Sequence, residues 1–143
     1  MLRTLATILL IFTALEGLPQ DFIISHKSCK ILGDIIERTS QPELFEVLEE
    51  QVKIRKFEIT YVTKNHKFNK GDLILSLERE VLAGSFFSPC FIKITIKEEG
   101  AKKLFFSTGI KRSLPRHYKS DNYLCKLAVR DVLYHLPTCR ITP

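Results

Sequence analysis

The sequence lacks tryptophan, and its 143 residues include one methionine and six glycines, none gathered in a phosphate-binding loop. It contains no Asn-x-Ser/Thr sequon, so we predict no N-linked glycan. No serine or cysteine stands in a nucleophile elbow or in a recognisable Cys/His signature, which leaves nucleophilic catalysis without a motif. Two carboxylate pairs, Glu49-Glu50 and Glu98-Glu99, lie in charged stretches, and we interpret them as solvated side chains rather than as a glycosidase site. We therefore predict that the protein is not an enzyme and has no cofactor.

Long apolar runs are also absent after the first seventeen residues. In that segment Arg3 precedes an apolar run from Leu5 to Leu15, and Gly17 follows it. This order is typical of a cleaved secretory signal, because the run is too short to span a bilayer. We expect a signal peptide over 1–17 and a single domain over 18–143, since no repeat or linker divides the rest. The predicted location is secreted, or lysosomal or otherwise lumenal.

Acidic residues are outnumbered, and the formal net charge is +6. A basic chain outside the cytosol favours anionic partners: a lipid headgroup, an anionic membrane surface, an acidic glycan or an acidic protein surface. In that compartment we do not expect nucleic acid to be a partner.

Four cysteines are present, and the gaps between them are 61, 35 and 14 residues. An even number in an oxidising compartment predicts disulfides, with three possible pairings. No two cysteines form a close pair, so we predict no zinc or other metal site. The four residues are Cys29, Cys90, Cys125 and Cys139.

One helix is predicted, over roughly 41–51. Ser40 and Glu43 have the spacing of a capping box, and Pro42 suits the first turn of a helix. Apolar residues also recur at helical spacing just before it, in the segment 31–36.

After residue 51 the apolar period changes to two, which predicts strands over 52–62, 73–83 and 90–97 and a further strand from residue 104. The apolar side changes within 52–62, and this indicates a bulge near Arg55. Arg79 is the one charge on the apolar side of its strand, and we interpret it as a side chain that reaches out to solvent or pairs with a carboxylate. The segment 122–139 is read as a last strand or hairpin, with a helix as the open alternative.

The segment 101–119 combines cations with apolar residues and contains no acid. Such a mixture suits contact with an anionic interface, in which cations meet headgroups and rings lie below them. The alternative is a strand and loop whose apolar side is core. The cations of this segment are Lys102, Lys103, Lys111, Arg112, Arg116 and Lys119.

Two stretches resemble the ML (MD-2-related lipid-recognition) family, in particular its ganglioside activator branch. They are LEREV at 77–81 running on to the proline-cysteine at 89–90, and the leucine-proline at 114–115 followed by DNY at 121–123 and by Cys139. The gap between Cys29 and Cys90 is similar to the spacing in that branch.

The resemblance implies a mostly β fold: an immunoglobulin-like two-sheet β-sandwich with an apolar cavity that holds an acyl or glycolipid tail. It also implies a bridge between Cys29 and Cys139, which leaves Cys90 and Cys125 to pair or to stay free. The implied function is lipid binding, transfer or presentation without catalysis. The candidate lipid-binding residues are Phe86, Phe87, Phe91, Phe105 and Phe106. The implied headgroup-binding residues are Lys102, Lys103, Lys111 and Arg112.

An α+β cystatin-like fold is the alternative, because one helix followed by antiparallel strands has that order. The segment 51–55 lacks the glycine of the inhibitor motif, and no Pro-Trp pair exists. A secreted signalling ligand that binds a protein partner or receptor through its basic face is a further alternative.

Overall fold

The computed structural model describes residues 23–81, 89–112 and 121–142. The predicted signal peptide, together with Phe86 and Phe87, lies outside these residues. Strands make up 43% of the described residues and helices 31%. In chain order the elements are β1 Ile23–His26, β2 Lys30–Asp34, α2 Ile35–Ser40, α3 Pro42–Ile54, β3 Glu58–Val62, β4 Leu73–Val81, β5 Cys90–Glu98, β6 Leu104–Arg112, α4 Asp121–Tyr134 and β7 Thr138–Ile141.

In the part of the chain that the structure describes, seven strands form two sheets. The larger sheet has the order β3-β2-β4-β5-β6, in which β2 is parallel to β3 and β4, and the remaining neighbours are antiparallel. The smaller sheet pairs β1 with β7 in parallel. The prediction of a mostly β chain with two sheets and a helix near 41–51 is therefore confirmed.

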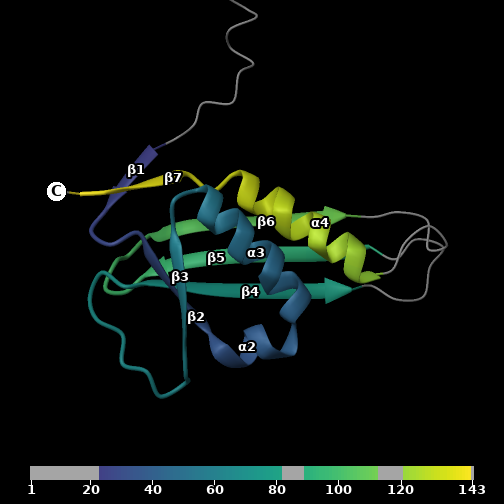
Figure 1. Cartoon of the computed structure of the whole chain (residues 1–143), viewed down its shortest axis with the longest axis horizontal. Helices are drawn as coiled ribbons and strands as arrows, with labels where there is room; N and C mark the ends of the chain where they lie inside the picture. Colours follow the sequence, from purple (N-terminus) through teal and green to yellow (C-terminus); the bar gives the residue numbers. More distant parts are fainter. Residues whose placement is uncertain (1–22, 82–88, 113–120, 143) are drawn as a thin grey trace, which may run out of the picture.

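The layers differ from those of an immunoglobulin-like sandwich. Helices α3 and α4 lie side by side over one face of the five-stranded sheet, where the second sheet of a sandwich would stand (Figure 1). The core fills the interface between the helices and the sheet, and β4 contributes Leu73, Leu75 and Leu77 to it. Glu78 and Glu80 of the same strand are exposed on the other face, as their alternation predicts.

Helix α3 explains why the prediction of a strand over 52–62 is wrong at its start. Val52 is fully buried as part of the helical stripe that includes Leu44 and Leu48. The helix ends where Lys56 adopts a positive φ of 64° and the N–H of Phe57 donates to the carbonyl of Val52 at 3.0 Å. This pattern is a Schellman motif, so the expected bulge near Arg55 is a helix end.

The last predicted strand or hairpin, over 122–139, is largely a helix, α4, followed by the short strand β7. Its buried residues recur at i, i+1, i+4 and i+5, which is the spacing of one helix face against a sheet. The helical spacing over 31–36 is also misleading. Residues Lys30–Asp34 form the strand β2, and the short helix α2 begins only at Ile35.

Two disulfides join elements that are distant in the sequence. Cys29 bonds Cys139 across 110 residues, next to the β1–β7 pair, and Cys90 of β5 bonds Cys125 of α4 across 35 residues. All four cysteines are paired. The pairing implied by the family resemblance is confirmed, although the layers are not those of a sandwich.

Candidate functional site

The predicted aromatic residues do not line one site. Phe106 is a core residue with 8% exposure. Phe105 is half-buried, and its ring meets the rings of Phe57 and His26 edge to face at 6.1 and 6.0 Å. Phe91 lies on the open face of the sheet, where it covers Gly109. These three aromatic side chains therefore lie in three different environments.

The predicted headgroup cations fall at opposite ends of β6. Lys102 and Lys103 precede this nine-residue strand and Lys111 and Arg112 end it, so the two pairs are separated by about 25 Å at the usual rise of a strand. Arg112 forms an ion pair with Asp131 of α4, and both belong to a shallow pocket between β6 and α4. Only Lys102 and Lys103 remain candidates for one cationic surface.

Lys102 and Lys103 belong to a larger cationic surface that includes the loop before β4. The N–H of Gly71 donates to Glu99 at 2.9 Å and the N–H of Glu99 donates to Asp72 at 2.8 Å, so the β3–β4 loop lies against the β5–β6 turn (Figure 1). We call this surface the basic end. It consists of five exposed lysines: Lys67, Lys70, Lys97, Lys102 and Lys103.

The acidic residues of the basic end are less exposed than its lysines. Asp72, Glu98 and Glu99 are all half-buried. Oδ2 of Asp72 accepts a hydrogen bond from the backbone of Asn69 at 2.8 Å, and a carboxylate oxygen of Glu98 lies 3.7 Å from Nε2 of His26. The outermost charge of this end is therefore positive.

Two apolar side chains are exposed beside these lysines. Leu104 is 56% exposed and pairs with Lys97 in the β5–β6 ladder. Ile141 is 63% exposed and pairs with His26, whose ring meets that of Phe105. Both apolar side chains thus flank one ring contact at the end of the molecule that carries the lysines.

A second candidate site is a groove at the β3 edge of the five-stranded sheet, which is the edge opposite β6. It has a volume of about 510 Å³ and lies between α3 and the strand β3. Val52 and Phe57 provide a buried apolar floor, and Ile59 and Tyr61 are half-buried beside them. We call it the edge groove.

A network of three side chains borders the edge groove. Oε1 of Glu49 accepts hydrogen bonds from the hydroxyl of Tyr61 at 2.7 Å and from Nε of Arg38 at 2.8 Å. Partial burial alone would raise the pKa of Glu49, but these two hydrogen bonds and the charge of Arg38 outweigh it and lower the pKa. Burial, together with the bond to Glu49, raises the pKa of Tyr61. Glu49 is thus held ionised and Tyr61 neutral.

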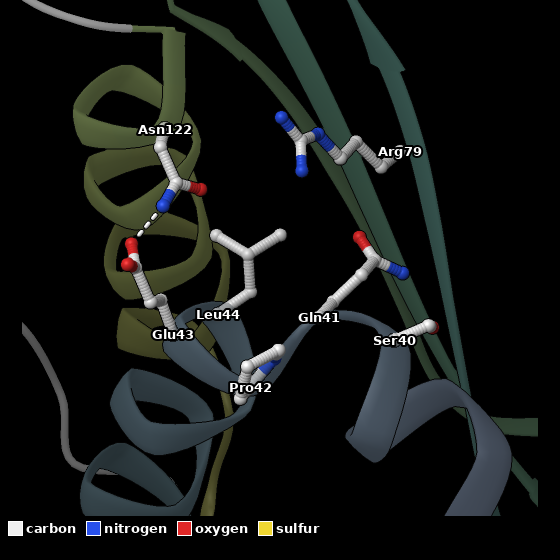
Figure 2. A pocket seen from close by; sticks show the side chains of 7 residues that line it. All are labelled: Ser40, Gln41, Pro42, Glu43, Leu44, Arg79 and Asn122. Carbon is white, nitrogen blue, oxygen red and sulfur yellow. Dashed lines mark hydrogen bonds between the residues drawn. The ribbon is translucent and has the colours of Figure 1, made fainter.

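A third pocket, of about 330 Å³, lies where α3 and α4 begin (Figure 2). Arg79 continues the buried side of β4, opposite Ile92, but its side chain is exposed and its guanidinium points into this pocket. The reading of Arg79 as a side chain that reaches out to solvent is therefore confirmed. Across the pocket Asn122 donates to the carboxylate of Glu43. The pocket thus presents one cation and one carboxylate that already has a partner.

The described part of the chain has neither a metal-binding cluster nor a membrane-spanning helix. Its histidines, cysteines and carboxylates form no group of three that could hold a metal ion. None of the helices in residues 23–81, 89–112 and 121–142 is long and apolar enough to cross a membrane.

The sequence reasoning missed most of the basic end and all of the edge groove. The basic end had a signal, because the residues between Glu58 and Asp72 include Lys64, Lys67 and Lys70 and no acid. The edge groove had no such signal in the sequence, because its walls are α3 and β3, and the predicted strand over 52–62 included the end of α3.

No family model matches this chain, and no curated protein matches it. Among solved structures, the chain is similar to a minor lipoprotein from Acinetobacter baumannii, with 12% identity, coverage of 75% of this chain and 87% of that chain, and a TM-score of 0.42. It is also similar to the rare lipoprotein B from Shewanella oneidensis, with 16% identity, coverage of 73% and 88%, and a TM-score of 0.39. Similarities of this size say nothing about function, and the resemblance to the ML family stays a prediction.

Proposed function

We propose that this protein is a secreted, non-enzymatic lipid-binding protein that contacts an anionic lipid surface with its basic end. The observation that carries the proposal is the placement of five exposed lysines around Leu104 and Ile141, while the neighbouring carboxylates are half-buried. Lysines near an anionic leaflet contribute about 1 kcal/mol each, and an inserted leucine contributes about 1.5 to 3 kcal/mol. Together these groups are sufficient for reversible binding.

The distribution of the remaining charge supports one orientation. Helix α3 carries four glutamates and one lysine, whereas the basic end gathers exposed lysines from two loops. An anionic surface would attract the basic end and repel the exposed side of α3. The two disulfides, which use all four cysteines, agree with an oxidising compartment.

The test is sedimentation of the purified protein with vesicles of phosphatidylcholine containing phosphatidylglycerol, against vesicles of phosphatidylcholine alone. The variant Lys67→Gln/Lys102→Gln/Lys103→Gln should bind the anionic vesicles about 100-fold more weakly, at roughly 1 kcal/mol per lysine. The matched control, Lys53→Gln/Lys111→Gln/Arg130→Gln, removes the same charge from exposed positions elsewhere and should bind nearly as well as the unaltered protein.

A second variant separates insertion from attraction. Leu104→Ser should weaken binding without changing its dependence on salt, because the lysines remain. Equal binding by the two triple variants, or no binding to anionic vesicles at low salt, would rule the proposal out.

A further inference from the structure

Strand β3 is an edge of the five-stranded sheet, and in the described residues no strand pairs with its outer side. In its ladder with β2 the N–H of Glu58 donates to the carbonyl of Cys29 at 2.9 Å. Successive residues of a strand turn their N–H and C=O groups to opposite sides. Glu58, Thr60 and Val62 therefore bond β2, whereas Ile59 and Tyr61 turn their backbone groups outward.

Ile59 and Tyr61 are also the residues whose side chains line the edge groove. The outward donors and acceptors thus run beside an apolar trough, with α3 as its far wall. Only a polypeptide supplies alternating N–H and C=O groups at the required two-residue spacing of about 6.8 Å. An extended peptide added to β3 would place every second side chain in the groove, against Val52 and Phe57.

Nothing in the sequence of β3 protects this edge. Natural edge strands are commonly blunted by proline, by lysine or by a bulge. The five residues of β3, EITYV, include neither proline nor lysine, and their register with β2 is unbroken by a bulge. This edge is therefore available for pairing with another strand.

Charge at the rim of the groove indicates the composition of the occupant. Lys53 is exposed at the end where α3 stops, and it has no carboxylate partner among the described residues. At the other end the carboxylate of Glu49 is already bonded by Arg38 and Tyr61. Glu58, which also lines the groove and is exposed, belongs to β3, so the α3 side of the rim offers Lys53 as a cation that an acid of the occupant can pair.

A second copy of this chain suits the edge poorly. Two copies, each with a formal charge of +6, repel each other. A pairing limited to two five-residue strands would also bury much less than the roughly 1,000 Å² expected of a specific interface between proteins. A peptide avoids both problems, because it can carry acids and fill the groove with its own side chains.

We propose that the edge groove binds an extended peptide segment of another protein by strand addition to β3, with apolar residues at alternate positions and an acidic residue next to Lys53. This inference concerns a protein partner and is independent of the lipid surface proposed above, because Lys53 and β3 lie outside the basic end.

The test begins with selection of binders from a phage-displayed library of random dodecapeptides, using the full folded chain as the target. Enriched peptides should alternate apolar residues and carry an acid at one end. Their synthetic forms should protect the amides of Ile59 and Tyr61 from hydrogen exchange, while the amides of Glu58, Thr60 and Val62 are protected with or without peptide.

Two variants examine the backbone and the charge separately. Ile59→Pro removes an outward N–H without removing a bond to β2, and it should weaken binding by at least about tenfold. Lys53→Glu should weaken binding about tenfold at low salt, and the control Lys111→Glu, with the same change of charge at a distant exposed site, should have no effect. If Ile59→Pro does not fold, the comparison of Lys53→Glu with Lys111→Glu carries the test.

Failure to enrich any peptide would overturn the proposal, as would peptides whose binding is unchanged in Ile59→Pro and Lys53→Glu. A symmetric dimer in analytical ultracentrifugation, dissociated by Ile59→Pro, would overturn it in favour of a second copy.

Discussion

The hydroxyl of Tyr61 donates a hydrogen bond of 2.7 Å to Oε1 of Glu49, and this bond ties the edge strand β3 to helix α3. The ring of Tyr61 also meets that of Phe45 edge to face at 5.9 Å, and the guanidinium of Arg38 lies 5.1 Å from its centroid. One side chain therefore contacts the core, an ion pair and the edge groove.

Removing that hydroxyl should destabilise the fold. We expect Tyr61→Phe to lower the free energy of unfolding by about 1 to 2 kcal/mol, because a hydrogen bond to a partly buried carboxylate is lost. Tyr134→Phe is the control, since Tyr134 is 56% exposed, and it should change stability by less than about 0.5 kcal/mol. Urea denaturation measures both values, and equal effects would contradict the structural role assigned to Tyr61.

The lowered pKa of Glu49 predicts how stability depends on pH. The folded-state pKa lies below the unfolded-state value of about 4.3, so this group stabilises the fold above that pH. The stabilisation should be lost as pH falls through the folded-state pKa. In Glu49→Gln, stability should be lower at neutral pH and should decline less below pH about 4. Thermal unfolding at a series of acidic pH values compares the two chains.

Two glycines in close contact with aromatic rings should differ in their tolerance of alanine. A Cβ at Gly33 would lie 3.0 Å from the ring of Tyr61, and one at Gly109 would lie 3.0 Å from the ring of Phe91. The first ring is held by its contacts with Phe45 and Glu49, whereas the second lies on the open face and can move. We expect Gly33→Ala to cost about 1 to 3 kcal/mol and Gly109→Ala less than about 1 kcal/mol. The reverse order in denaturant titrations would contradict this reading of the two contacts.

Lys56 provides a stabilising substitution. It occupies a left-handed position, with φ of 64°, at the end of α3. Glycine meets no steric penalty there, so we expect Lys56→Gly to raise the free energy of unfolding by about 0.5 to 1 kcal/mol. A decrease in the melting temperature would show that the lysine side chain has a compensating role.

The two disulfides should contribute unequally to stability. In the entropy model, closing loops of 110 and 35 residues stabilises by about 4.8 and 3.8 kcal/mol respectively. We therefore expect Cys29→Ala/Cys139→Ala to be less stable than Cys90→Ala/Cys125→Ala by about 1 kcal/mol. Guanidinium denaturation of the two variants provides the comparison, and a larger loss from the shorter loop would point to effects in the native state.

Local signals with one strong periodicity predicted their elements well. The helix predicted over 41–51 matches α3, although no capping box forms, because Gln41 is the N-cap and the hydroxyl of Ser40 donates to the carbonyl of Glu37. The period of two that predicts strands over 73–83 and 90–97 marks β4 and β5. Alternation failed over 123–129, because only Cys125 and Val129 of the alternating residues, which are four apart, lie on the buried face of α4, whereas Tyr123 is exposed and Leu127 is half-buried. Val132 and Leu133, both fully buried, complete the helical stripe of α4.

The candidate sites depend on proximity between segments, which a single sequence does not contain. Lys102 and Lys103, predicted to bind headgroups, are exposed, but the sequence could not show that the loop with Lys67 and Lys70 lies against them. It grouped them instead with Lys111 and Arg112, because neighbours in sequence separate when a nine-residue strand runs between them. The edge groove required the end of α3 and the strand order, and both arise from packing over the whole domain.

The parallel pairing of β1 with β7 determines how the domain would respond to tension. A pull that separates Ile23 from Thr142 loads the β1–β7 hydrogen bonds in shear, so that several must break together. The Cys29–Cys139 bond then prevents the force from unfolding the 110-residue segment that the bond closes. Under force, an oxidised domain could therefore lengthen by only the few residues outside this bridge, whereas a reduced one could unravel through both sheets.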